Sequence, residues 1–237
     1  MSGLKEIRNR ISSVSSTMQI TNAMKMVSAA KLKKAQDSIS ATLPYSNKLS
    51  ELIKNISAST DSDDTNPLFE KRESKNLLII AITSNKGLCG GFNSNIIKEV
   101  NNIKATRASK RVDLLTIGKK GDDILSKKFE IISSHNDVYD NFNYNNIKEI
   151  AETIMQKFSD KEYDEVILVY NHFKNAATQI VTTEQYLPIE ESAEENNSVS
   201  GDYIFEPNRP KILNELIPKS LSIQLFKATS DSIAGEH

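Results

Sequence analysis

Residues 4–18, LKEIRNRISSVSSTM, predict the most distinctive element of the chain, a long helix. Its apolar residues recur at alternating spacings of three and four, at Leu4, Ile7, Ile11, Val14 and Met18. This heptad spacing is typical of a helix that packs along a second helix. We therefore expect the N-terminal region to supply one half of a helix pair.

The helical pattern continues well beyond this stretch. The next positions in the same heptad frame are first polar and then mostly apolar: Thr21, Lys25, Ser28, Leu32, Ala35, Ile39 and Leu49. Pro44 removes one backbone hydrogen bond and is expected to bend the helix. One helix over residues 3–57 would be about 80 Å long. That length exceeds what a globule of 237 residues can enclose, so part of the helix must project.

The polar positions in the seam need an explanation, because a buried lysine at position 25 would be costly. This stretch must therefore face water or a third partner. The neighbouring methionines Met18, Met24 and Met26 are by default expected to belong to the core of the helix pair.

The N-terminal arm is basic although the whole chain is nearly neutral. Residues 1–36 contain seven lysines and arginines against one acid, Glu6, which gives a net charge of +6. Because the chain carries −1 in total, residues 37–237 carry −7. Such an arm indicates contact with an acidic surface, and nucleic acid, anionic lipid or an acidic protein would all fit.

After residue 75 the pattern changes to alternating strands and helices. The run LLIIAI at residues 77–82 is typical of a parallel strand buried on both faces. Further strands are expected at 112–117, 129–133, 165–170 and, at an edge, 178–186, and helices at 95–106 and 145–158. This alternation predicts an α/β fold with a small, mostly parallel sheet.

The same patterns divide the chain into five parts. We expect an N-terminal helix at 1–57, a polar linker at 58–75, an α/β base domain at 76–188, an acidic loop and foot at 189–208, and a C-terminal helix at 209–237. The last helix has no stop signal before Gly235 and is expected to be truncated.

The loop SNKGLCGGFN at residues 84–93 is the segment most like an enzyme site, since phosphates bind between a strand and a helix in α/β sheets. Its glycines do not have the spacing of the dinucleotide or Walker fingerprints. Cys89 has no histidine or aspartate close in sequence, and the three histidines lack metal-ligand spacing. The sequence therefore predicts no catalytic residue, no cofactor and no metal site.

Four segments of the chain resemble one family. STMQITNAMKMVSAAKLKKAQ at 16–36 and the loop at 84–93, with GLKEIRNRISSV at 3–14 and YIFEP at 203–207, are similar to the gamma subunit of the F-type rotary ATP synthase. The resemblance covers essentially the whole chain. It implies an antiparallel coiled coil of the N- and C-terminal helices that serves as a rotating central shaft, couples proton flow to ATP synthesis or hydrolysis, and binds no nucleotide itself.

The resemblance also implies the partners. The shaft would pass through a hexamer of alpha and beta subunits, and the base domain would touch the epsilon subunit and the ring of c subunits. The chain would meet the membrane only through the complex, on the cytoplasmic side of the cell inner membrane. An acidic loop of the family's beta subunits would account for the basic arm, and nucleic acid is not an expected partner.

Six residues become candidates for subunit contacts under this resemblance: Met24, Lys25, Lys86, Tyr203, Phe205 and Glu206. The first two would face the catalytic subunits, and Lys86 would pair with the acidic beta loop. The last three would lie in the foot, near epsilon and the c ring.

The C-terminal helix of the family is longer than residues 209–237. With only these residues as its partner, about half of the N-terminal helix is expected to be unpaired, with Leu4, Ile7, Ile11 and Val14 exposed.

Two other classes stay open. A stand-alone nucleotide-binding α/β protein with a helical oligomerisation arm would bind ATP or NAD as an isolated chain. A nucleic-acid binder would lose affinity steeply with salt, although the small side chains of residues 23–30 offer few groups for reading bases.

Overall fold

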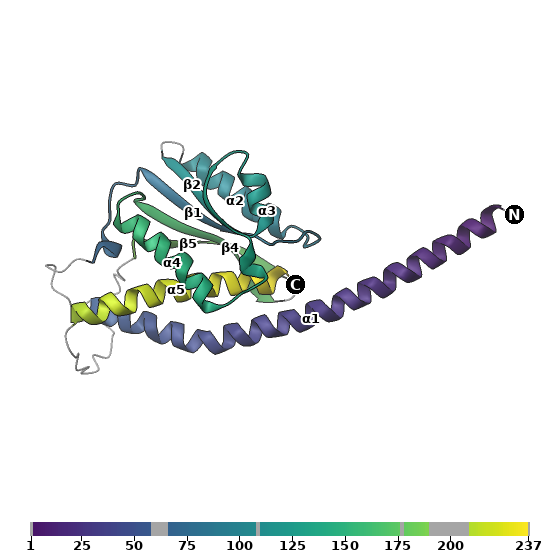
Figure 1. The fold of residues 1–237 in the computed structure, drawn as a ribbon, viewed down its shortest axis with the longest axis horizontal. Helices are drawn as coiled ribbons and strands as arrows, with labels where there is room; N and C mark the ends of the chain where they lie inside the picture. The colour runs from purple at the N-terminus through teal and green to yellow at the C-terminus, as the bar shows by residue number, and fades with distance from the viewer. Residues whose placement is uncertain (1, 58–65, 108–109, 176–177, 190–208, 237) are drawn as a thin grey trace.

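The computed structural model of the protein describes residues 2–57, 66–107, 110–175, 178–189 and 209–236. Helix α1, Ser2–Ser57, extends far beyond an α/β domain that the rest of these residues form (Figure 1). The expected combination of a small, mostly parallel sheet and two long terminal helices is confirmed. Tyr203, Phe205 and Glu206 lie outside the described residues.

The sheet has five strands in the order β3-β2-β1-β4-β5. Strands β1 (Asn76–Ile82), β2 (Arg111–Ile117), β3 (Glu130–His135) and β4 (Glu165–Asn175) run parallel, and β5 (Thr178–Leu187) pairs antiparallel with β4 at the edge. Residues 77–82 are fully buried, as their continuous apolar sequence predicts.

Helices cover both faces of the sheet. Helices α2 (Phe92–Thr106) and α3 (Lys119–Leu125) pack against alternate residues of β1, including Leu77 and Ile79. Helices α4 (Tyr144–Ser159) and α5 (Arg209–Glu236) pack on the opposite face, against Leu78 and Ile80. The period of two along a strand sends successive side chains to opposite faces and so produces two separate cores.

Part of the expected linker is packed rather than open. Residues 67–69 form the short 3₁₀ helix η1, whose Leu68 is buried in the core beneath α4. The Arg72 guanidinium lies 4.4 Å from the centre of the Phe158 ring and donates a 3.1 Å hydrogen bond to the Phe158 carbonyl oxygen. The apolar triplet PLF interrupts the polar stretch, and burial of its leucine holds the second half of this segment against the domain.

The second half of α1 packs along α5, and the two helices run antiparallel (Figure 1). Most of the partly or fully buried positions described in α1 follow the heptad frame: Ser28, Leu32, Ala35, Ile39, Thr42, Ser46, Leu49 and Ile53, with Ser38 and Leu52 beside it. Leu49 and Ile53 contact Ile223 of α5. The helix is bowed in Figure 1 and continues through Pro44 without ending. The heptad frame of residues 4–18, continued from Ser28 onward, is therefore the frame by which α1 meets α5.

Candidate interaction surface of the projecting helix and the glycine loop

Residues 2–27 of α1, here called the projecting half, extend away from the domain (Figure 1). Nine large apolar side chains of this half are 54–74% exposed: Leu4, Ile7, Ile11, Val14, Met18, Ile20, Met24, Met26 and Val27. The exposure expected for the first four of these is confirmed. The expectation that Met18, Met24 and Met26 belong to a helix-pair core is not met within the described residues, where all three are exposed. An apolar surface of this extent marks an interaction site.

The basic residues of the projecting half are available to a partner. Lys25 is exposed and makes no hydrogen bond or ion pair with any residue that the structure describes. Glu6 lies 3.9 Å from Arg10, between Oε1 and Nε, and both side chains are exposed. Such a pair within one helix contributes about 0.5 kcal/mol or less. The projecting half therefore combines apolar surface with positive charge.

A second exposed feature is the glycine loop, residues 84–91, between β1 and α2. Lys86 is exposed, and Leu88 is 99% exposed at a φ of 64°. Two hydrogen bonds connect the start of this loop to α2. The Ser84 backbone N–H donates to Asn93 Oδ1 at 2.9 Å, and Asn93 Nδ2 donates to Ser84 Oγ at 2.8 Å. Exposure of the apolar side chain and the positive φ each cost free energy in the isolated chain. The position of Leu88 is therefore consistent with contact to another molecule.

The N-terminus of α3, which contacts Thr83, Ser84 and Asn85, is not arranged for a phosphate. The N–H of Gly121, in the first turn of α3, donates to Thr83 Oγ1 at 2.8 Å. The neighbouring N–H groups of Lys119 and Lys120 donate to Asn85 Oδ1 and to the Ser84 carbonyl oxygen, at 2.9 and 3.0 Å. A phosphate at a helix N-terminus needs such donors, and here the protein itself occupies them.

The glycine loop and α1 come together at the end of α5. Burial raises the pKa of the Glu236 carboxyl above its ordinary value, and the positive charges of Lys86 and Lys31 oppose that rise. Lys86 of the glycine loop and Lys31 of α1 thus both lie close enough to Glu236 to act on its carboxyl, and Lys31 is about 9 Å along the helix from Lys25. The structure therefore brings Lys86 to the same side of the molecule from which the projecting half emerges.

Leu88 and Glu236 belong to this region, but the sequence patterns did not predict them as members of it. Leu88 could have been noticed as an apolar residue between glycines in a loop. Glu236 carries no comparable signal, since its two basic neighbours come from distant parts of the chain.

Comparisons with known proteins agree with this architecture. A family model described as ATP synthase matches residues 3–237. The ATP synthase gamma chain of Flavobacterium johnsoniae is 54% identical over 237 residues, which span all of this chain and 83% of that protein. The gamma chain of Geotalea uraniireducens is 41% identical over 239 residues, with the same coverage.

A solved structure supports the same relation. In the central stalk and c-ring of the Tetrahymena thermophila mitochondrial ATP synthase, one chain superimposes with a TM-score of 0.68 and 27% identity, covering 92% of this chain and 94% of that one.

An α/β domain with a two-helix stalk, matched over nearly its whole length, defines a subunit of a rotary ATP synthase. More narrowly, the chain belongs to the family of ATP synthase gamma chains, which form the central shaft of the rotor. This finding does not favour a stand-alone nucleotide-binding protein. None of the described helices is long and apolar enough to cross a membrane.

Proposed function

We propose that the projecting half of α1 is the part of this rotor shaft that lies inside a hexamer of alpha and beta subunits. The observation that carries this proposal is a helix that leaves the domain with its apolar seam exposed and with Lys25 making no ion pair or hydrogen bond, within the part of the chain that the structure describes. An acidic loop of the beta subunits would complement these charges and those of the glycine loop. Lys86 is the candidate partner of that loop, and Met24 and Lys25 are candidates for contact with the catalytic subunits.

The mechanism follows from the asymmetry of the shaft. A ligand shifts a conformational equilibrium only through different contacts with the two states. An asymmetric shaft inside a three-fold collar presents a different side to each catalytic subunit, so the three sites differ in nucleotide affinity. When proton flow turns the shaft, each site passes through the three states in turn. ATP hydrolysis drives the same cycle backwards and pumps protons.

In this proposal the chain transmits torque and performs no catalysis of its own. The base domain would contact the epsilon subunit and the c ring, with Tyr203, Phe205 and Glu206 as candidate contacts. The chain would be peripheral, on the cytoplasmic side of the cell inner membrane, and held there by the complex. Co-purification from native membranes tests this: recovery with alpha and beta chains supports the proposal, and recovery without them overturns it.

Reversing the two exposed charges is expected to weaken coupling. In Lys25→Glu combined with Lys86→Glu, both acidic side chains would face the acidic collar. Each exposed pair is worth about 1 kcal/mol or less, so the number of protons pumped per ATP hydrolysed should fall while the chain stays folded. Proton pumping and ATP hydrolysis are measured together in inverted membrane vesicles. An unchanged ratio would remove both residues from the contact surface.

A lysine at position 24 is expected to impair coupling more than one at position 18. Met24 lies beside the polar break of the seam, where an added charge would create a lasting contact with the collar and hinder rotation. Both methionines are exposed, at 54% and 59%. Neither Met24→Lys nor Met18→Lys should therefore shift the melting temperature of the isolated chain by more than about 2 °C. Equal coupling in the two variants would contradict the assignment of Met24.

A further inference from the structure

The last described turns of α5 are buried but polar. Thr229, Ser230, Asp231 and Ser232 are each 2% exposed or less. The hydroxyls of Thr229 and Ser230 donate to carbonyl oxygens of their own helix, those of Leu225 and Phe226, both at 2.8 Å. The hydrogen bonds of these two side chains therefore stay within α5 and do not connect it to the sheet.

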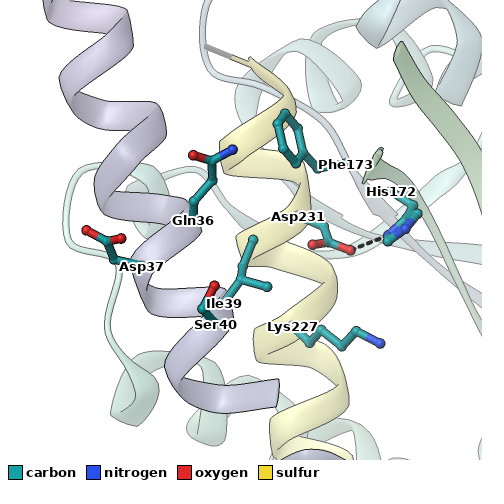
Figure 2. Close-up of a pocket in the computed structure, with 8 residues that line it drawn as sticks. All are labelled: Gln36, Asp37, Ile39, Ser40, His172, Phe173, Lys227 and Asp231. Atoms are coloured by element: carbon teal, nitrogen blue, oxygen red, sulfur yellow. Dashed lines mark hydrogen bonds and ion pairs between the residues drawn. The ribbon is translucent and has the colours of Figure 1, made fainter. Parts of the chain in front are cut away.

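Asp231 is different because it reaches out of the helix. Its Oδ2 lies 2.6 Å from Nδ1 of His172, near the end of β4. The Asp231 side chain is 3% exposed and the imidazole is 45% exposed. The pair lines a groove of about 510 Å³ together with Gln36, Ile39 and Ser40 of α1. Figure 2 shows Asp231 directed from α5 toward His172, with α1 on the other side of α5.

Charged groups from every neighbouring element face this pair. Lys227 of α5 and Asp37 of α1 line the same groove. Glu184 of β5, which accepts a hydrogen bond from Tyr170 of β4, acts on Asp231 from the sheet side. Burial raises the pKa of the Asp231 carboxyl above its ordinary value, and His172 and Lys227 oppose the rise.

The pair of His172 and Asp231 lies close to the point at which α1 leaves the α/β domain. Residues of α1 between 36 and 40 line the same groove, and the projecting half begins a few turns further along. Further back, α5 is held by apolar side chains such as Ile217 and Leu225, and by hydrogen bonds to β5: Tyr186 Oη donates to the Leu221 carbonyl oxygen at 3.0 Å, and Gln224 Nε2 donates to the Gln185 carbonyl oxygen at 3.3 Å. Among the described residues, the bond between His172 and Asp231 is the hydrogen bond that joins the last turns of α5 to the sheet. Apolar contact is non-directional and allows packed helices to slide slightly, whereas a hydrogen bond fixes distance and angle.

We propose that His172 and Asp231 are positioning residues of the rotor: their hydrogen bond fixes the rotational and axial position of α5 on the sheet, so that torque entering the base reaches the shaft. This role rests on the membership of the gamma-chain family and is independent of the proposed contacts of Lys25 and Lys86. It assigns a mechanical function to a buried carboxylate inside the chain rather than at its surface.

The first test measures how firmly the end of α5 is held. In the full chain, Asp231→Ala and His172→Ala each remove one partner of the bond and should raise amide hydrogen exchange over residues 229–236 about tenfold, which corresponds to about 1.4 kcal/mol. His172→Asn keeps an N–H donor close to the position of Nδ1 and should recover most of the protection. Ser230→Ala is the matched control, since this buried hydroxyl bonds only within α5, and it should exchange like the parent chain.

The second test separates a mechanical role from a merely structural one. In the assembled synthase, the protons pumped per ATP hydrolysed should fall in Asp231→Ala and His172→Ala and should be restored in His172→Asn. If exchange rises in Asp231→Ala but the pumping ratio stays at the parent value, the proposal is overturned. Loss of coupling in the Lys25 and Lys86 double variant would not bear on it.

Discussion

Gly118→Ala is expected to unfold the α/β domain under conditions in which the parent chain is stable. Gly118 follows β2 and precedes α3 at a φ of 100°, which side chains rarely adopt. A Cβ at this position would lie 1.8 Å from the carbonyl oxygen of Thr83, at the end of β1. The clash involves the backbone of two neighbouring strands, so no side-chain movement relieves it. We expect a loss of more than about 4 kcal/mol, a large share of the stability of a domain.

The measurement is thermal denaturation followed by circular dichroism, with a fall in melting temperature of more than about 8 °C. Gly87→Ala is the matched control, because a Cβ there meets nothing within 4 Å, and it should shift the melting temperature by no more than about 2 °C. Adding Thr83→Ala should not rescue Gly118→Ala, since the obstructing atom belongs to the backbone. If Gly118→Ala had the same melting temperature as the parent chain, the backbone at the ends of β1 and β2 would be able to move apart, and the expectation would be wrong.

Periodicity in the sequence predicts the elements of this fold that are long and strongly patterned. The heptad frame of residues 4–18 reappears in the structure as the contact seam of α1, down to Leu49 and Ile53. The apolar run at 77–82 is the central strand β1. In both cases the residues that are buried recur at the period of the helix or strand, so the apolar pattern in the sequence predicts which residues pack.

Short elements were not predictable in the same way. Helix α3 has seven residues, and η1 has three, with a single buried leucine at position 68. Neither is long enough to display a period. The 3₁₀ helix is stabilised by tertiary contacts of Leu68 and Arg72, which a polar, turn-rich sequence does not reveal.

One part of the candidate site was predictable from the sequence and another part was not. The exposure of the projecting seam follows from the relative lengths of two helices and was predictable. The proximity of Lys86 to Glu236 and the bond between His172 and Asp231 join residues 59 or more positions apart. Such contacts depend on how β4, α5 and the glycine loop are placed in space, and no local pattern encodes them.

Hydrogen exchange along α1 is expected to differ by at least about hundredfold between its two halves in the isolated chain. An isolated helix is only marginally stable in water, and residues 3–27 have no tertiary contact within the described structure to add to it. Leu49 and Ile53 are buried against Ile223 of α5, so opening the helix there requires breaking packed contacts. Exchange measured by mass spectrometry on overlapping peptides should be fast over residues 3–27 and slow over 46–53.

Ile223→Ala supplies the control for this expectation. It removes the α5 side chain that Leu49 and Ile53 contact, and it should raise exchange over 46–53 at least about tenfold while leaving residues 3–27 unchanged, because they are already unprotected. In the assembled complex, the collar proposed above should slow exchange in the projecting half as well. Uniform protection along α1 in the isolated chain, at concentrations low enough to exclude association, would contradict the unpaired state of the projecting half. The apolar seam and the charge of Lys25 would then no longer be free for the catalytic hexamer, and the proposed docking of the shaft would lose its basis.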